Sequence, residues 1–166
     1  MELPAELITK IDEVITHYPV SKRSAVLSVL HLLQHHFGFI SDECVTWTAD
    51  KLGLQPVQVM EVVTFYPGFR RSAPGKYHIR VCRTLSCAMA GSYELMSTLT
   101  KLTGIDRSHV DHHHPIANSP DGAFSIEFAE CLASCGSGPV CMFNDDFYEK
   151  VSTEDAAKLV AEYRNK

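Results

Sequence analysis

The chain has 166 residues, of which 45% are hydrophobic and 21% charged, and a formal net charge of −5 at pH 7. This is an ordinary globular composition, with enough residues for one good core or two small ones, and the negative charge argues against binding to nucleic acid or acidic lipid. No apolar run approaches the roughly 20 residues that a membrane span needs, and the N-terminus lacks the basic and apolar segments of a secretory signal.

Apolar residues recur at helical spacing in the first part of the chain, up to Pro74. They predict short helices with brief connections, which would form a small helical bundle over residues 1–72. Ser41, followed by Asp42, is a good N-cap, and Pro56 suits the first turn of a helix. The predicted helices run from Pro4 to Tyr18, from Ser21 to His36, from Ser41 to Gly53, and from Pro56 to the residue before Tyr66.

The second part, residues 73–166, has the pattern of an α/β domain. Tyr77 and Ile79 begin an alternation of apolar and polar residues with the period of a strand. Ser152, with Asp155 three residues later, predicts the start of the last helix. The predicted elements are a strand over 77–82, a helix over 88–102, strands over 110–117 and 124–128, a hairpin of strands 140–143 and 147–151, and a final helix. Strands and helices in this order pack as layers.

Two pairs of cysteines each follow a predicted strand. Cys82 and Cys87 lie at the end of the first strand and in the loop beyond it. Cys131 and Cys135 are followed by Gly136-Ser137-Gly138-Pro139, small residues that let the backbone come close to whatever the sulfurs bind. Two pairs from distant segments can close a four-thiolate site around one metal centre. In a chain of cytoplasmic character, cysteines are better explained as metal or redox ligands than as disulfides.

The spacing of the cysteines leaves the identity of the centre open. A structural zinc takes four thiolates from two closely spaced pairs, and a 2Fe-2S cluster also takes four, two for each iron. A thiol–disulfide enzyme would need a Cys-x-x-Cys pair, which neither pair has. The spacing of plant-type ferredoxins is absent as well.

The wider sequence resembles the thioredoxin-like 2Fe-2S ferredoxin family, represented by the NuoE-type component of bacterial NADH:quinone oxidoreductase, respiratory complex I. The resemblance covers nearly the whole chain. It rests on Gly38-Phe39-Ile40, Thr64-Phe65-Tyr66 and Phe69 in the first part, and on Pro74-Gly75, Val81-Cys82, Cys87, Gly91, Asp121-Gly122, Glu130-Cys131-Leu132, Cys135, Pro139-Val140 and Asn144-Asp145 in the second.

This resemblance implies a small N-terminal helical bundle followed by a thioredoxin-like α/β domain with one 2Fe-2S cluster. It implies that Cys82, Cys87, Cys131 and Cys135 are the ligands of that cluster. The implied function is electron transfer within an NADH dehydrogenase, where the cluster exchanges single electrons with the FMN of a partner subunit that also binds NADH. The implied location is cytoplasmic, peripheral to the inner membrane through the larger respiratory complex, without insertion into the membrane.

Two alternatives to this function remain at the level of the sequence. The same module occurs in NAD-linked hydrogenases and formate dehydrogenases, and a zinc-stabilised interaction module would have no redox role. We find no residue suited to act as a nucleophile or general base and no Gly-rich phosphate loop. No catalytic residue is therefore predicted, and the isolated chain is not expected to be catalytic.

The sequence departs from the family pattern at a few positions. Ala133 stands where the family usually has Gly, and Gly138 stands where Ala is common. The segment Ser108–Ser119 is longer than the usual connection, and its run His112-His113-His114 is interpreted as a solvated loop.

Other conspicuous residues are interpreted as structural. Cys44 and Cys141 are expected to be packed as small hydrophobes. Phe65, Tyr66 and Phe69 are expected in the core, with docking of a partner as the alternative. Arg80 and Arg83 flank Cys82, where positive charge would stabilise a reduced cluster.

Overall fold

The structure, a computed structural model, describes residues 2–111 and 114–166. The chain divides into two compact units, residues 1–73 and 74–166, where the sequence predicted a boundary between residues 72 and 73. The predicted loop residues His112 and His113 lie outside the described residues. In the part of the chain that is described, no helix combines the length and the apolar character needed to span a bilayer.

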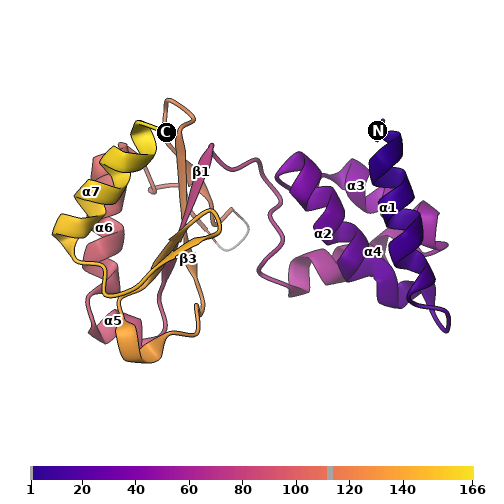
Figure 1. The fold of residues 1–166 in the computed structure, drawn as a ribbon, viewed down its shortest axis with the longest axis horizontal. Coiled ribbons are helices and arrows are strands. Elements are labelled where there is room, and N and C mark those ends of the chain that lie inside the picture. Colours follow the sequence, from indigo (N-terminus) through magenta and orange to yellow (C-terminus); the bar gives the residue numbers. More distant parts are fainter. Residues whose placement is uncertain (1, 112–113) are drawn as a thin grey trace. The chain divides into compact units, whose positions relative to one another are not determined.

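The first unit is a helical bundle (Figure 1). Its helices are α1 (Ala5–Thr16), α2 (Val26–Phe37), α3 (Asp42–Leu52) and α4 (Pro56–Phe65), with a 3-10 turn, η1 (Lys22–Ala25), before α2. The predicted bundle is confirmed. The predicted second helix was wrong at its start, because the chain from Lys22 to Ala25 makes the tighter 3-10 turn before the α-helix begins.

The helices of the first unit share one apolar core. Each contributes at least one buried residue, among them Ile11, Val29, Ala49 and Val63. The predicted N-cap of α3 is present, since the Ser41 hydroxyl accepts a hydrogen bond of 3.2 Å from the Cys44 N–H.

The aromatic residues that end the first unit are only partly in its core. Phe69 is buried, as predicted, but the prediction was wrong for Phe65, which is 76% exposed, and for Tyr66, which is 41% exposed. The helix ends at Phe65 and the chain turns into extended backbone at Tyr66. The two rings therefore pack on each other, with centroids 5.0 Å apart, outside the apolar core of the bundle.

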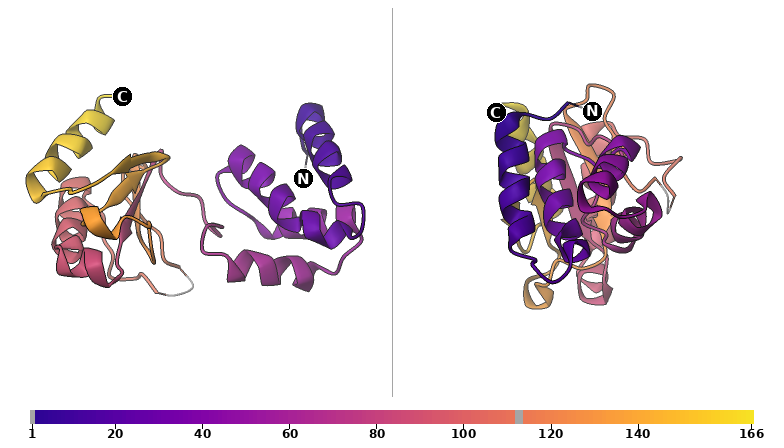
Figure 2. Two further views of the ribbon diagram at one scale, coloured as in Figure 1. Left: turned by 60° about the horizontal axis from the view of Figure 1, so that its bottom comes forward. Right: turned by 90° about the vertical axis from the view of Figure 1, so that its right-hand side faces the viewer.

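The second unit is a mixed sheet with helices on one face. Its strands are β1 (Tyr77–Cys82), β2 (Ala117–Asn118), β3 (Phe124–Ala129), β4 (Cys141–Phe143) and β5 (Asp146–Tyr148), and its helical segments are α5 (Leu85–Met89), α6 (Ser92–Thr103), η2 (Cys135–Ser137) and α7 (Thr153–Arg164). The strand order is β2-β3-β1-β4-β5, with β1 parallel to β3 and the other pairs antiparallel. Helices α6 and α7 lie on the same side of the sheet in both views (Figures 1 and 2). The predicted α/β class is confirmed.

Three predicted elements of the second unit were wrong in extent. The single helix over 88–102 is two helices, because Gly91 takes φ 100° between them. Of the strand predicted over 110–117, the described residues form a strand only at its end, in β2 (Ala117–Asn118). The hairpin strands are shorter than predicted, with Asn144 at φ 53° in the turn. The final helix begins as predicted, with a capping box of Ser152 and Asp155.

The face of the sheet away from α6 and α7 carries a buried polar network. On β1, the His78 side chain is 2% exposed. Its Nδ1 lies 2.8 Å from the Ser125 hydroxyl and its Nε2 lies 2.9 Å from a Glu127 carboxylate oxygen, both on β3. The parallel register, which sets His78 opposite Ser125, brings these side chains together. Strand alternation predicted polar residues on this face but not their burial.

Candidate metal centre

The parallel pairing of β1 with β3 brings the two cysteine-bearing segments to the same edge of the sheet. The last pair in the register is Cys82 with Ala129. The Arg83 N–H donates to the Ala129 carbonyl at 3.0 Å, and the Cys82 N–H donates to the Val140 carbonyl at 3.2 Å. Since the carboxyl ends of parallel strands lie at one edge, the chain beyond each strand starts within hydrogen-bonding reach of the other segment.

The first cysteine pair is buried. Cys82 is the last residue of β1, and Cys87 lies in the middle of the short helix α5 rather than in the predicted loop. Both are 2% exposed and pack with Val140 and Leu132. The two thiols are close enough to share a hydrogen bond. Helix α5 therefore turns Cys87 back toward the end of β1.

The second cysteine pair is exposed. Cys131 follows β3 closely, and its sulfur accepts a hydrogen bond of 3.3 Å from the Ala133 N–H. Cys135 opens the 3-10 turn η2. It lies near enough to Cys87 for its charge to oppose ionisation of that thiol. The structure thus brings Cys135 toward the buried pair and leaves the exposed pair at the outer side of the site.

Hydrogen bonds around Cys82 favour its thiolate, the form that binds metal. Burial opposes ionisation, but hydrogen bonds with Thr84 and with the Leu132 N–H outweigh it and lower the pKa of Cys82. The Thr84 hydroxyl lies 3.2 Å from the sulfur. For Cys87 the balance is reversed, because burial and the hydrogen bond with Cys82 raise its pKa.

The other two cysteines are packed in the cores, as predicted. Cys44 lies in the core of the first unit and Cys141 in the core of the second. Burial raises the pKa of the Cys141 thiol to about 12. Cys141 therefore stays protonated at neutral pH and is a poor metal ligand.

The donor set at the sheet edge suits a binuclear centre. Among residues 2–111 and 114–166, no three His, Cys, Asp or Glu side chains lie together as ligands for a metal ion. A 2Fe-2S cluster takes two thiolates at each of two irons. Two cysteine pairs on separate segments, with N–H groups directed at two of the sulfurs, have the chemistry for such a cluster.

Comparison with known proteins decides the family. The sequence profile of the thioredoxin-like 2Fe-2S ferredoxin family matches residues 11–164. The chain belongs to this family.

Several relatives in the family are similar over most of their length. An NADH-quinone oxidoreductase subunit of Aquifex aeolicus is 37% identical over 162 residues, covering 98% of this chain and 96% of the relative. Subunit 2 of the Thermus thermophilus enzyme is 37% identical over 144 residues, covering 86% and 75%. An NADH-quinone oxidoreductase subunit of Rickettsia felis is 35% identical over 156 residues, covering 93% and 89%.

A solved structure shares the fold. The NAD+-reducing NiFe-hydrogenase in its H2-reduced state superposes with a TM-score of 0.68 at 15% sequence identity, over 85% of this chain. The matched region is 22% of the hydrogenase chain. At this identity the likeness concerns the fold alone.

The two single-residue departures from the family pattern have different structural consequences. Ala133 has φ 58°, in the left-handed region where Gly carries no Cβ penalty. Gly138 lies against α5, where a Cβ would be 3.4 Å from the Cys87 sulfur and 3.3 Å from the Ala90 Cβ. Position 138 therefore admits only a very small side chain, whereas position 133 favours the Gly of the family.

We expect Ala133→Gly to stabilise the second unit by about 0.5–1 kcal/mol. The left-handed conformation costs Ala about 1–2 kcal/mol, and the extra freedom of Gly in the unfolded chain offsets about 0.5–1 kcal/mol of the gain. The midpoint of denaturant unfolding, at unchanged slope, measures the effect. Ala157→Gly, at an exposed position of α7, is the matched control and should cost about 1 kcal/mol. A loss of stability in Ala133→Gly would contradict the argument.

The arginines beside Cys82 are engaged with other groups. Arg83 forms an ion pair with Glu130, and hydrogen bonding to that carboxylate raises the pKa of Arg83. Arg80 donates to the Asn144 carbonyl at 3.2 Å. The carboxylate of Glu130 offsets the positive charge of Arg83, so the charge predicted to favour a reduced cluster is smaller than the sequence indicated.

Proposed function

We propose that this chain is the electron-transfer subunit of an NADH:quinone oxidoreductase, and that Cys82, Cys87, Cys131 and Cys135 hold its 2Fe-2S cluster. The observation that carries the proposal is that the segments bearing the two cysteine pairs begin at the same edge of the sheet, where β1 and β3 end, with Cys135 near Cys87. The family match over residues 11–164 and the oxidoreductase relatives support it.

The surroundings of the cysteines would fit them for this role. When bound, a 2Fe-2S cluster accepts and releases one electron at a time. The N–H groups of Leu132 and Ala133 donate to sulfurs of both pairs, which stabilises negative charge there. Leu132 and Val140 cover the buried pair with apolar surface, which limits access of water to one side of the site.

The proposed partner is a subunit that binds FMN and NADH. NADH delivers two electrons together as hydride, and a flavin can pass them on singly. The exposed pair, Cys131 and Cys135, would lie on the side through which electrons enter. In this assignment the chain is a peripheral component on the cytoplasmic side of the membrane complex.

The alternatives have weaker support. The hydrogenase shares the fold at 15% identity, compared with 37% identity for the NADH-quinone oxidoreductase subunits. A zinc site would make the purified protein colourless, because Zn2+ has a filled d shell and no redox chemistry. Visible absorption and iron content of the anaerobically purified chain therefore test zinc directly.

We expect the isolated, cluster-bearing chain to stay oxidised when mixed with NADH and to be reduced by dithionite. Hydride has no direct acceptor in a one-electron centre without flavin. Visible absorption and the electron paramagnetic resonance signal of the reduced protein report the outcome. Addition of the FMN-bearing subunit should make the same centre reducible by NADH.

Two controls sharpen this experiment. Heat-denatured partner subunit, which cannot present FMN in its site, should leave the chain oxidised. Dithionite reduction of the same sample confirms that the centre is intact. Rapid reduction of the flavin-free chain by NADH alone would overturn the proposal, because it would require a nicotinamide site on this chain.

A further inference from the structure

Arg107, in the segment after α6, is a half-buried cation without a carboxylate partner in the part of the chain that is described. Within residues 2–111 and 114–166, its guanidinium makes neither an ion pair nor a hydrogen bond, and its Nε is buried without a partner. Burial lowers the pKa of Arg107. The adjacent Asp106 is already occupied, since its two carboxylate oxygens accept from the Ser108 N–H and hydroxyl, each at 2.9 Å. A buried donor without an acceptor is costly, so this site calls for an explanation.

Arg164 provides a comparison within the same unit. Arg107 lies over the ring of Phe128 at 4.9 Å, and Arg164 lies over the ring of Phe124 at 5.4 Å. Arg164 also pairs with the carboxylate of Asp121 at 3.5 Å. The two arginines therefore share the stacking contact with a β3 phenylalanine, and the carboxylate is what Arg107 lacks.

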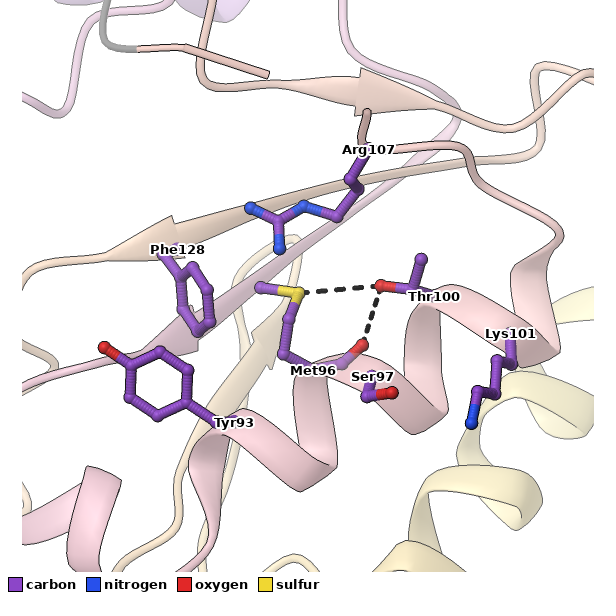
Figure 3. A pocket seen from close by; sticks show the side chains of 7 residues that line it. All are labelled: Tyr93, Met96, Ser97, Thr100, Lys101, Arg107 and Phe128. Atoms are coloured by element: carbon purple, nitrogen blue, oxygen red, sulfur yellow. Dashed lines mark hydrogen bonds between the residues drawn. The ribbon is translucent and has the colours of Figure 1, made fainter. Parts of the chain in front are cut away.

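Arg107 borders a small open pocket between α6 and β3 (Figure 3). The volume of the pocket is about 330 Å³, at the lower end of the range for small-molecule sites. The guanidinium extends over Met96 and toward Phe128, and Tyr93 and Lys101 lie at opposite ends of the pocket. The rings of Tyr93 and Phe128 pack with centroids 5.1 Å apart. The pocket thus combines an apolar wall with two cations.

We propose that this pocket binds a small apolar carboxylate, whose carboxyl group pairs with Arg107 and whose aromatic or branched body lies over Met96 and the ring of Phe128. The planar guanidinium matches a carboxylate with two parallel hydrogen bonds. The apolar wall of the pocket favours a ligand with an apolar group larger than the methyl group of acetate. A free acid and the C-terminal residue of a peptide present the same chemistry, and the test separates them.

The site is independent of the proposed redox function. Its lining comes from α6, Phe128 and Arg107, and it includes none of the six cysteines. The cluster can therefore be absent while the pocket binds, or present while the pocket is empty. Failure of one proposal leaves the other standing.

The test is a titration of the full chain labelled with 13C in its methionine methyl groups. The probes are 3-phenylpropionate, its neutral amide, acetate, and N-acetyl-Ala-Phe with a free C-terminus. We expect 3-phenylpropionate to shift the Met96 methyl resonance saturably, and Met60 and Met142 to stay unchanged as internal controls. The amide should bind about tenfold or more weakly, the factor of one charge-assisted hydrogen-bonded pair. Acetate should not bind.

Substitutions then test the residue assignment. Arg107→Met should weaken 3-phenylpropionate about tenfold or more, and Arg164→Met, which removes the matched arginine, should leave the affinity unchanged. Tighter binding of N-acetyl-Ala-Phe than of the free acid would identify a peptide C-terminus as the source of the carboxylate. Equal binding of acid and amide to the unaltered chain, or no binding of any probe, would overturn the proposal. This part of the test uses only the unaltered chain, so it does not depend on whether a variant folds.

Discussion

Cys131→Ala is expected to remove the 2Fe-2S cluster, and Cys82→Ala is expected to do the same from the buried side of the site. Each iron of the cluster depends on two thiolates, and the two residues come from different segments. Iron and acid-labile sulfide content after anaerobic purification, together with visible absorption, measure the loss. The effect should be near complete for both variants, and full iron and sulfide in Cys131→Ala would remove Cys131 from the ligand set.

Cys141→Ala is the matched control. Cys141 follows the site closely in sequence, but it belongs to the apolar core of the second unit and its pKa is raised to about 12 by burial. The variant should keep its iron, its sulfide and its spectrum. Cys44→Ser, in the other unit, should keep them as well. Loss of the cluster in Cys141→Ala without loss of folding would show that the assignment of the ligands is wrong.

The sequence was sufficient for elements whose ends are marked by local chemistry. The Ser41 and Ser152 caps mark the starts of α3 and α7. In each cap the Ser hydroxyl accepts a hydrogen bond from the backbone N–H three residues later, so the signal is local in the sequence. Pro56 starts α4 for the same local reason. The positions of the cysteines relative to strands followed from the period of β1 and β3. These features depend on neighbours in the chain and are therefore visible without the fold.

Features that depend on distant residues were not predictable in this way. Gly91 gave no sign that one helix would be two, since a lone Gly is tolerated in a helix. Strand β2 depends on pairing with β3 at Ala117 and Asn118 only, which the sequence pattern around it does not mark. Phe65 has a large apolar side chain of the kind found in cores, and its exposure follows from the position at which α4 ends.

The candidate sites also differ in how far the sequence alone could predict them. The cysteine pairs were predicted because thiols at such spacing have few roles other than as metal or redox ligands. The isolation of Arg107 was not visible, since an arginine in a polar segment usually finds a carboxylate or water. Burial of His78 was missed because alternation along β1 assigns it to the polar face. Only the register with β3 shows that Ser125 and Glu127 lie beside it.

His78→Leu is expected to lower the free energy of unfolding of the second unit by about 3 kcal/mol. With Glu127 ionised, the imidazole donates from Nε2 to the carboxylate and accepts at Nδ1 from the Ser125 hydroxyl. Leucine fills similar space but leaves a largely buried carboxylate and a buried hydroxyl without this partner. Denaturant unfolding followed by far-ultraviolet circular dichroism measures the loss. Fluorescence of Trp47, the single Trp of the chain, reports on the first unit.

A second variant separates the polar network from simple packing. In His78→Leu/Ser125→Ala/Glu127→Leu, the imidazole and the two β3 side chains that contact it are all replaced by apolar groups, so the Glu127 carboxylate is not left buried without the imidazole. Replacement of a whole buried network by apolar groups is often close to neutral, whereas removal of one partner is costly. The triple variant should therefore recover most of the stability that His78→Leu loses, a coupling that single-site additivity cannot produce. If the three substitutions instead added their costs, packing of the His78 ring would be the source of the stability and the network would contribute little.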